Sequence, residues 1–530
     1  MISTWHGLET AKRGLSTQQT ALHTISHNIA NANTKGYTRQ RVNFTTTNPY
    51  PGTGINRPGI PGQLGTGVEA GAIERVRESF LDVQYRLENN KLGYYSTLSS
   101  ALSKMEDIMN EPSDSGLASV MDKFWSALQD LANHTENTGA REVVATTGEM
   151  VADTINYYFN SLNRIKSDLG NEINVTIKEI NTIITQINDL NRQIAGVEPH
   201  GQLPNDLYDK RDLLVDQLSN LVNIRVTNVR PKNYGQASTT ASGIYQIELV
   251  QADGTSYSPP AHLISVDYVS GRSNTNLVTI VDEHGYSDPI RGEVSHILVG
   301  NQRLDHMEFS GKLAGLIDSY GYLAPDGSVK GYYPEMMEDL NKLTEAFAKE
   351  FNFIHQGGYD LDGNPGEAFF IFDPNKPAET ITVNPNILAD SSKVAAGRNP
   401  GESGDNENAK LLAAIKSKDF NQYEYIKPDE NGVINDTLPA GLSGSFDTFY
   451  ASMIGNMGVK SQSFSKDMAN TQVLVDSVEY NRQSVSGVSL DEEMTNMITF
   501  QHAYNAAARM ITVIDEMLDK IINGMGVVGR

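Results

Sequence analysis

The sequence predicts a mainly α-helical protein with a β-rich insert, in which long helices from both ends of the chain form one bundle. Three observations support this fold class. Apolar residues repeat at helical spacing near both termini and over long internal blocks. The interval 225–303 is instead rich in β-branched residues and turn signals. At 530 residues the chain is too long for one compact core, so we expect several domains.

The first helix is predicted from a heptad near the N-terminus. Its positions are spaced alternately by three and four residues, and Gln18 is the polar member. The apolar members are Leu8, Ala11, Leu15, Leu22, Ile25, Ile29 and Ala32. This spacing puts them on one face of a helix that packs against another helix.

The last helix carries two adjoining stripes. One stripe consists of Leu490, Met494, Met497, Gln501, Tyr504, Ala508, Ile511, Asp515, Leu518 and Ile522. The other consists of Phe500, Ala507, Met510, Ile514, Met517 and Ile521. A helix with two adjoining stripes needs more than one neighbour.

The charges of the two ends also predict that they meet. Residues 1–45 hold five basic side chains and one acidic one, whereas Leu490 onward holds six acidic and three basic ones. Such segments are electrostatic complements.

Between the ends, helical patterns alternate with β-like intervals. Helices are predicted over 80–109, 121–132, 155–194, 207–222, 333–353, 409–415 and 446–482, and Asn205 or Asp206 is the expected N-cap of the fourth. Runs such as IYQIELV and LVTIVD predict strands in the insert, a second β-like interval covers 366–384, and ENGV near Asn431 suggests a hairpin.

This order predicts three domains. Residues 1–60 and 486–530 form an inner domain of terminal coiled-coil helices. A helical domain comprises 61–224, 304–364 and 409–485, and a β-rich outer domain comprises 225–303 and 365–408. Because helices flank the insert on both sides, we expect it at the pole opposite the termini. We also expect that a short flexible linker can replace residues 227–303 and leave export and much of the protein's function intact.

Composition excludes several classes of function. A net charge of -23 argues against nucleic acid as a partner. The absence of cysteine excludes disulfides, thiolate metal sites and cysteine nucleophiles. No apolar run is long enough for membrane insertion. The first residues also lack the pattern of a cleavable signal, so export would need a signal-independent machine.

No motif indicates an enzyme, a metal or a cofactor. His23 and His27 have a spacing that can hold a metal on a helix, but no third ligand is near in the sequence, so we interpret them as interface histidines. GTGVEAG at Gly65 misses the dinucleotide-binding spacing and is interpreted as a loop. Asp360 and Asp362 lack the further acids of a calcium loop, which favours a tight turn.

The stretch NIANANTKGYTRQ, residues 28–40, ends the first helix abruptly. Asn31 and Asn33 tolerate the left-handed conformation that ends helices, and Gly36 adopts it without cost. Thr34 and the asparagine amides can satisfy the free backbone groups. The following extended segment displays Tyr37, Arg39 and Arg41. A plain helix stop needs fewer of these residues, so we predict that something docks around the turn.

This stretch resembles the N-terminal signature of the bacterial flagellar axial proteins, which are rod, hook and hook-associated proteins. SVSGVSLDEEMTNMITFQHAYNAAARMITVIDEML, residues 484–518, resembles their C-terminal signature. Four internal stretches narrow the resemblance to the hook-associated proteins at the hook–filament junction: NDLYDKRDLLVDQLSNLV (205–222), GKLAGLIDS (311–319), FNFIHQGGYDLDGN (351–364) and GDNENAKLLAAI (404–415). The β-rich insert matches only loosely.

The resemblance implies a structural, non-enzymatic protein that polymerises at the distal end of the flagellar hook and connects it to the filament. It implies an inner helical domain from both termini, an adjoining helical domain and an outward β domain. The implied partners are further copies of the chain, the hook protein, a second junction protein (hook-associated protein 3), and the flagellar export chaperone and type III export apparatus. The implied location is the bacterial flagellum, outside the cell, and no cofactor is implied.

We expect the assembly interface to combine the heptad, the turn and a C-terminal stripe. Its residues are Leu8, Leu15, Leu22, Ile25, Ile29, Asn31, Thr34, Gly36, Tyr37, Arg39, Leu490, Met494, Met497, Tyr504, Ile511 and Leu518. The turn would set the angle of the inner helix and present Tyr37 and Arg39 to neighbouring subunits. Two alternatives stay open: a hook protein proper, and a surface adhesin that displays the insert. Isolated helices are marginal in water, so we expect about the first 50 and last 40 residues to be mobile before assembly.

Overall fold

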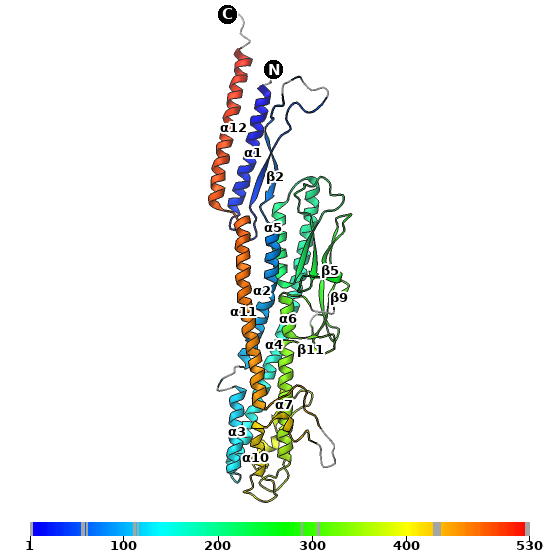
Figure 1. The fold of residues 1–530 in the computed structure, drawn as a ribbon, viewed down its shortest axis with the longest axis vertical. Coiled ribbons are helices and arrows are strands. Elements are labelled where there is room, and N and C mark those ends of the chain that lie inside the picture. Colours follow the sequence, from blue (N-terminus) through cyan, green and yellow to red (C-terminus); the bar gives the residue numbers. More distant parts are fainter. Residues whose placement is uncertain are drawn as a thin grey trace.

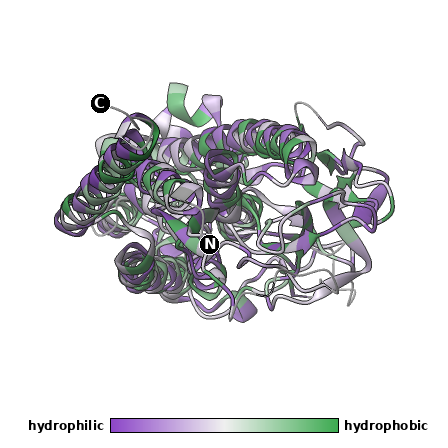
Figure 2. Cartoon of the chain, turned by 90° about the horizontal axis from the view of Figure 1, so that it is seen from above, coloured by the Kyte–Doolittle hydropathy of each residue, from purple (hydrophilic) through white to green (hydrophobic). Residues whose placement is uncertain are grey.

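The computed structural model describes residues 4–54, 59, 62–109, 113, 116–287, 290–304, 308–427 and 436–524. The protein is elongated, and both ends of the chain lie at the same end of the molecule (Figure 1). It is mainly α-helical with a β-rich insert, which confirms the predicted fold class. Seen along the long axis, most helices carry polar and apolar segments on different sides, as expected for packed amphipathic helices (Figure 2).

The elements follow one another in this order. The helices are α1 (Thr4–Ala30), α2 (Ser79–Met109), α3 (Leu117–Asn133), α4 (Thr138–Val197), α5 (Asn205–Leu221), α6 (Lys312–Tyr320), α7 (Tyr332–Gln356), α8 (Pro377–Thr380), α9 (Pro385–Ala389), α10 (Glu407–Ala414), α11 (Phe446–Ser486) and α12 (Leu490–Gly524). The strands are β1 (Gln40–Thr46), β2 (Val68–Arg75), β3 (Ile224–Val229), β4 (Ile244–Val250), β5 (Ser256–Val266), β6 (Ser273–Thr275), β7 (Val278–Asp282), β8 (Val294–Val299), β9 (Gln302–Leu304), β10 (Tyr322–Leu323), β11 (Val329–Lys330), β12 (Phe370–Ile371) and β13 (Thr382–Val383).

The terminal section consists of α1, α12 and the hairpin of β1 and β2. The two helices lie side by side, and the antiparallel hairpin lies against α1 (Figure 1). The sequence analysis missed this hairpin and interpreted the residues around Gly65 as a loop, whereas β2 begins at Val68. The signal was weak because the strands are mostly half-exposed and therefore lack a clear apolar alternation.

The body is built along α4, which spans 60 residues. Isoleucines repeat along one face of this helix and are buried, including Ile173, Ile180 and Ile187. The side chain of Asn137 caps the first turn, because it accepts a hydrogen bond from the backbone N–H of Gly139. Helices α2 and α11 pack together along much of their length, with α5 and α6 beside α2.

Two sheets cover one side of the body. Their strand orders are β3-β4-β5-β6 and β11-β10-β8-β7, and β9 also pairs with β8. Two asparagines of α4 bind strand backbone directly. Asn191 bonds both the N–H and the C=O of Tyr245, and Asn181 does the same for Val278. The helix thus satisfies backbone groups at the sheet and fixes its position.

We expected the insert at the pole opposite the termini, but the structure places it elsewhere. The sheets lie halfway along the molecule, and α3, α7 and α10 form the far end (Figure 1). The insert also shares its buried core with the helices, since Tyr245, Ile247 and Ile280 belong to the same apolar cluster as α4 and α5. A short linker in place of residues 227–303 would therefore expose part of the helical core.

Residues 365–408 do not join the insert either. The pair β12–β13 forms a separate small sheet that contacts α4 and α7. There Phe369 and Phe370 pack into an aromatic cluster with Phe124, Phe347 and Phe351. Their β-like sequence predicted strands correctly but could not show which partner the strands would cover.

Smaller differences concern single elements. Helix α6 was not predicted from the sequence. The N-cap position of α5 is Pro204 rather than Asn205 or Asp206. The segment after His355 forms the expected tight turn, in which Asp360 accepts hydrogen bonds from the backbone and side chain of Asn364. The hairpin suggested near Asn431 lies outside the described residues.

Gly93 marks the closest approach of α2 to α5. A Cβ atom there would lie 2.2 Å from the backbone oxygen of Asn220. We predict that Gly93→Ala lowers the free energy of unfolding by about 1–3 kcal/mol or more, because the two helices must separate. Gly196 in α4 is the matched control, since a Cβ there meets nothing within 4 Å. Gly196→Ala should raise stability by about 0.5–1 kcal/mol. Denaturant unfolding of both variants measures the difference, and equal effects would contradict the close contact.

Candidate assembly site at the base of the terminal helices

The base of α1 is organised around Asn28, whose side chain is 1% exposed. Its Nδ2 donates to the backbone oxygen of Gln40 at 2.8 Å and to Oε2 of Glu493 at 3.0 Å. Its Oδ1 accepts from the hydroxyl of Tyr37 at 2.7 Å and from the N–H of Gln40 at 3.0 Å. One buried amide thus uses all four of its hydrogen-bonding positions. It ties together α1, the start of β1 and α12.

The turn after α1 is closed by the residues that the sequence singled out for this task. The side chain of Asn31 donates to the backbone oxygen of His27 and accepts from the hydroxyl of Thr34. Gly36 has a φ of 83°, in the left-handed region. The side chain of Leu213 in α5 lies so close that a Cβ at Gly36 would be 3.3 Å from it. Glycine is therefore required both by conformation and by this contact.

Tyr37 and Arg39 are not displayed to solvent, contrary to our expectation. The hydroxyl of Tyr37 contacts Asn28 and the Nδ1 of His27. Burial raises the pKa of Tyr37, and the nearby carboxylates of Asp206, Asp209 and Glu493 raise it further, so the phenol stays a hydrogen-bond donor.

Arg39 binds the start of α12. Its Nε donates to Glu493 at 2.7 Å, and its two terminal nitrogens donate to the two oxygens of Glu492 at 3.0 Å each. Its backbone N–H donates to the oxygen of Ser486, the last residue of α11. This fork-to-fork pairing is among the stronger ionic contacts in proteins. The predicted charge complementarity of the two ends is thereby confirmed, but within one chain.

Glu493 is the residue that the sequence analysis missed at this site. It is 1% exposed and receives hydrogen bonds from both Asn28 and Arg39. Three acidic residues occupy the first turn of α12, where the helix dipole favours negative charge. The sequence alone could not distinguish a carboxylate that stabilises the helix end from one that binds a distant arginine.

Helices α1 and α12 run antiparallel and approach closely. A Cβ at Gly7 would lie 3.3 Å from Ile514, and one at Gly14 would lie 3.9 Å from Ala507. Farther along α1, Asn28 meets Glu493. Positions rise along α1 as they fall along α12, which establishes the direction. Gly7 and Gly14 therefore face α12, next to the half-buried Leu8 and Leu15 of the predicted heptad.

The predicted seam residues divide into buried, half-buried and exposed sets. Ile25 is buried, whereas Leu8, Leu15, Leu22 and Ile29 are half-buried. On α12 the half-buried members are Met497, Tyr504, Ile511 and Leu518. Leu490 and Met494 are exposed, at 48% and 56%. Phe500 and Ile514 of the second stripe are also half-buried, so α1 covers the boundary between the two predicted stripes rather than either one.

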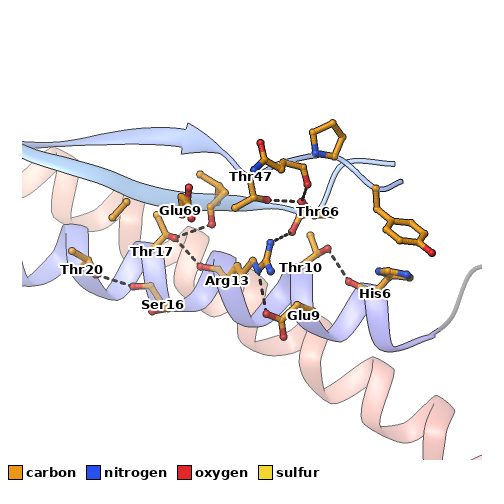
Figure 3. A pocket seen from close by; sticks show the side chains of 15 residues that line it. His6, Glu9, Thr10, Arg13, Ser16, Thr17, Thr20, Thr47, Thr66 and Glu69 are labelled. Atoms are coloured by element: carbon orange, nitrogen blue, oxygen red, sulfur yellow. Dashed lines mark hydrogen bonds and ion pairs between the residues drawn. The ribbon is translucent and has the colours of Figure 1, made fainter. Parts of the chain in front are cut away.

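The hairpin closes the other side of α1. The hydroxyl of Thr17 donates to the backbone oxygen of Val68, and Arg13 donates to that of Thr66 (Figure 3). Between α1 and the hairpin lies an open groove of about 800 Å³, lined mainly by threonines and other polar side chains (Figure 3). On its other face the hairpin contacts α12, where the rings of Phe44 and Phe500 meet edge to face.

The arrangement offers contacts rather than catalytic chemistry. Within the described part of the chain, no group of three or more histidine, aspartate or glutamate side chains is placed to hold a metal ion. His23 is exposed, and His27 lies near Tyr37 and Asp206. No helix among the described residues is long and apolar enough to cross a membrane.

Comparison with known proteins shows the family to which the chain belongs. Residues 102–370 match the family model described as "Flagellar hook-associated protein FlgK helical domain". The "Flagellar hook-associated protein 1" of Bacillus subtilis (strain 168) is 43% identical over the full length of both chains. The chain belongs to the flagellar hook-associated protein 1 family. The member from Escherichia coli (strain K12) is 25% identical and covers 97% of this chain and 99% of its own.

The two ends match models of the wider axial family. Residues 8–38 match "Flagella basal body rod protein", and residues 481–524 match "Flagellar basal body rod FlgEFG protein C-terminal". These spans contain Asn28, Tyr37, Glu492 and Glu493, whereas Arg39, Gln40 and the hairpin lie outside them. The flagellar hook junction protein FlgK from Burkholderia pseudomallei has the same fold, with a TM-score of 0.55 and 13% identity over 76% of this chain and 100% of its own. The comparisons thus identify the chain as a flagellar hook-associated structural protein.

We predict that Asn28→Ala loosens the whole base of α1. It removes four hydrogen bonds and leaves Glu493 and Gln40 without their buried partner, which should cost about 1–3 kcal/mol. Asn33→Ala, an exposed asparagine in the same turn, is the control and should change nothing. Thermal unfolding and amide exchange of residues 37–42 are the measurements. Equal behaviour of the two variants would show that Asn28 is not the organising residue.

The contacts at the base also revise the expected mobility of the free chain. Residues 28–46 are tied by Asn28, Arg39 and the hairpin, so we no longer expect the first 50 residues to be uniformly mobile. We predict that amide exchange in the monomer increases away from the base, from slow at Asn28–Val42 to fast at Thr4–Leu15 and after Met510. Exchange that is equally fast throughout α1 would contradict this gradient.

Proposed function

We propose that the chain polymerises at the distal end of the flagellar hook and connects the hook to the filament. The observation that carries this proposal is an uncovered apolar stripe on α12. Met510, Val513, Met517 and Ile521 are 46–55% exposed. Their spacing of three and four residues puts them on one flank of the helix, beside the face that α1 covers.

Near Met517, the opposite flank of α12 is polar. It carries Gln501, Asn505, Thr512 and Glu516, all exposed, while its apolar members Met494 and Ile498 lie nearer the start of the helix. Exposed apolar residues aligned on one side of a helix mark a contact surface, and burial of each such side chain is worth roughly 1.5–3 kcal/mol. A chain with an uncovered apolar flank on a long terminal helix is suited to polymerise with further copies of itself.

The proposed partners follow from this role. Besides further copies, they are the hook protein on one side and hook-associated protein 3 on the other. The flagellar export chaperone and the type III export apparatus would deliver the chain to its place outside the cell. The comparisons support this indirectly, since a protein with this fold is named as the flagellar hook junction protein of Burkholderia pseudomallei.

The direct test adds purified protein to isolated hooks and images their tips. A junction protein should form a short cap at the distal end only and then stop. A hook protein proper, which is the nearer alternative, should instead extend the hook continuously or form long polymers by itself. Absence of any binding to hooks would refute the proposal.

The stripe provides a matched pair of variants. Met517→Asp places a charge on the apolar flank, whereas Thr512→Asp places it on the polar flank of the same helix. Because both side chains are exposed, we predict that neither variant changes the melting temperature by more than a degree or two. Only Met517→Asp should abolish capping of hooks, because assembly would bury the charge. Equal capping by both variants would show that this flank is not an interface.

A further inference from the structure

The continuous apolar core of the body stops before it reaches the terminal section. Its buried members come from residues 101–457, and in the described part of the chain none belongs to α1, β1, β2 or α12. The terminal section has its own few buried apolar residues: Ala11, Ala21, Ile25 and Val42. No shared apolar core therefore fixes the terminal section to the body.

Polar contacts with α5 take its place. The N–H of Thr38 donates to Asp209 at 3.0 Å, and Gln40 donates to Asp206 at 3.1 Å. One terminal nitrogen of Arg75, at the end of β2, donates to Asp209 at 2.9 Å and to Asp212 at 2.8 Å. The packing of Leu213 on Gly36 adds an apolar contact. We call this set of contacts the joint.

The carboxylates of the joint form a ridge on α5. Asp206, Asp209, Asp212 and Asp216 are spaced by three or four residues, so they follow one face of the helix at steps of about one turn, or about 5 Å. The last carboxylate of this row, Asp216, is paired with arginines of the body. Arg86 and Arg482 pair with Asp216.

The two middle carboxylates, Asp209 and Asp212, differ in how strongly their surroundings stabilise the negative charge. Burial opposes the charge of Asp212, but Arg77, Arg75 and Arg86 outweigh it and hold the pKa of this carboxyl far below its usual range. At Asp209 burial is the larger effect, and its pKa is raised although Arg75 and Thr38 act against this. Asp212 is therefore a firm anchor, whereas Asp209 is a weaker and more exchangeable partner.

Open space flanks the joint on two sides. A hollow of about 400 Å³ lies between the hairpin, α5 and β4, and another of about 250 Å³ lies between the hairpin and the end of α11. Both are lined by Glu74, Arg75 and Arg77. The hairpin therefore has unfilled space on two sides at this place.

We propose that the joint is an articulation, in which the terminal section takes more than one angle to the body by exchanging Arg75 and Thr38 between neighbouring carboxylates of α5. A close-packed apolar interface allows one arrangement. A row of carboxylates along α5 offers further settings about one helical turn apart, and shifts of one turn are a known form of conformational switch. This property belongs to the free chain and does not depend on the role at the hook.

The experiment measures the angle directly. The chain has no cysteine, so Thr46→Cys in β1 and Ser463→Cys in α11, both exposed, allow two spin labels to be attached specifically. Pulsed dipolar spectroscopy then gives the distance distribution between hairpin and body in the full-length monomer. Since β1 extends about 20 Å from the joint, a tilt of about 10° moves its label by about 3–4 Å.

Two variants weaken the joint, and one is a control. Asp209→Asn removes the exchangeable carboxylate, and Arg75→Gln removes the cation. Lys166→Gln breaks the pair with Glu293 inside the body, at 2.6 Å, and matches the loss of one partly buried charge. We expect at least two distances, several ångströms apart, in the parent chain, and a changed proportion between them in both joint variants but not in the control.

Three results would overturn the articulation. They are a single narrow distance in the parent chain, an unchanged distribution in both joint variants, and the same change in the control. Melting curves recorded alongside show whether each variant is folded. If Arg75→Gln does not fold, Asp209→Asn decides alone, because its amide can still accept the hydrogen bond from Thr38.

Discussion

The carboxylate of Glu493, buried between Asn28 and Arg39, is the contact on which the terminal section depends. It joins residues separated by more than 450 positions and determines where α12 begins relative to α1. A buried carboxylate is unfavourable unless it is paired and hydrogen-bonded, and Arg39 and Asn28 satisfy both conditions here. The same asparagine closes the turn through Tyr37 and Gln40, so the direction of β1 follows from the same contact.

The two parts of the molecule are stabilised by different physical means. The body has an extensive apolar core that runs through the helices and into the sheets. The terminal section has little buried apolar surface of its own and leaves one flank of α12 uncovered. A section with so little buried apolar surface is less stable by itself than the body, and its exposed flank leaves apolar surface available for association. The ionic joint between the two parts keeps them in contact without merging their cores.

Much of the fold could be predicted because it depends on local patterns. Helical periodicity located α4, α7 and both terminal helices, and turn residues located the end of α1 with Asn31, Thr34 and Gly36 in their expected roles. The hairpin after this turn was missed, because half-exposed strands have no clear periodicity. The position of the β-rich insert was wrong, because it depends on contacts such as Asn191 with Tyr245 that no local pattern shows.

The sequence by itself determined the fold class, the family and the complementary charges of the two ends. These properties reside in composition, periodicity and motifs, which are readable along the chain. Only the tertiary structure decided that Arg39 binds Glu492 and Glu493 of its own chain. It also decided that the heptad leucines of α1 are only half-buried, and that α12 keeps an apolar flank free. The physical reason is that a side chain's partner depends on which distant segments meet, and the spacing of residues along one helix does not contain that information.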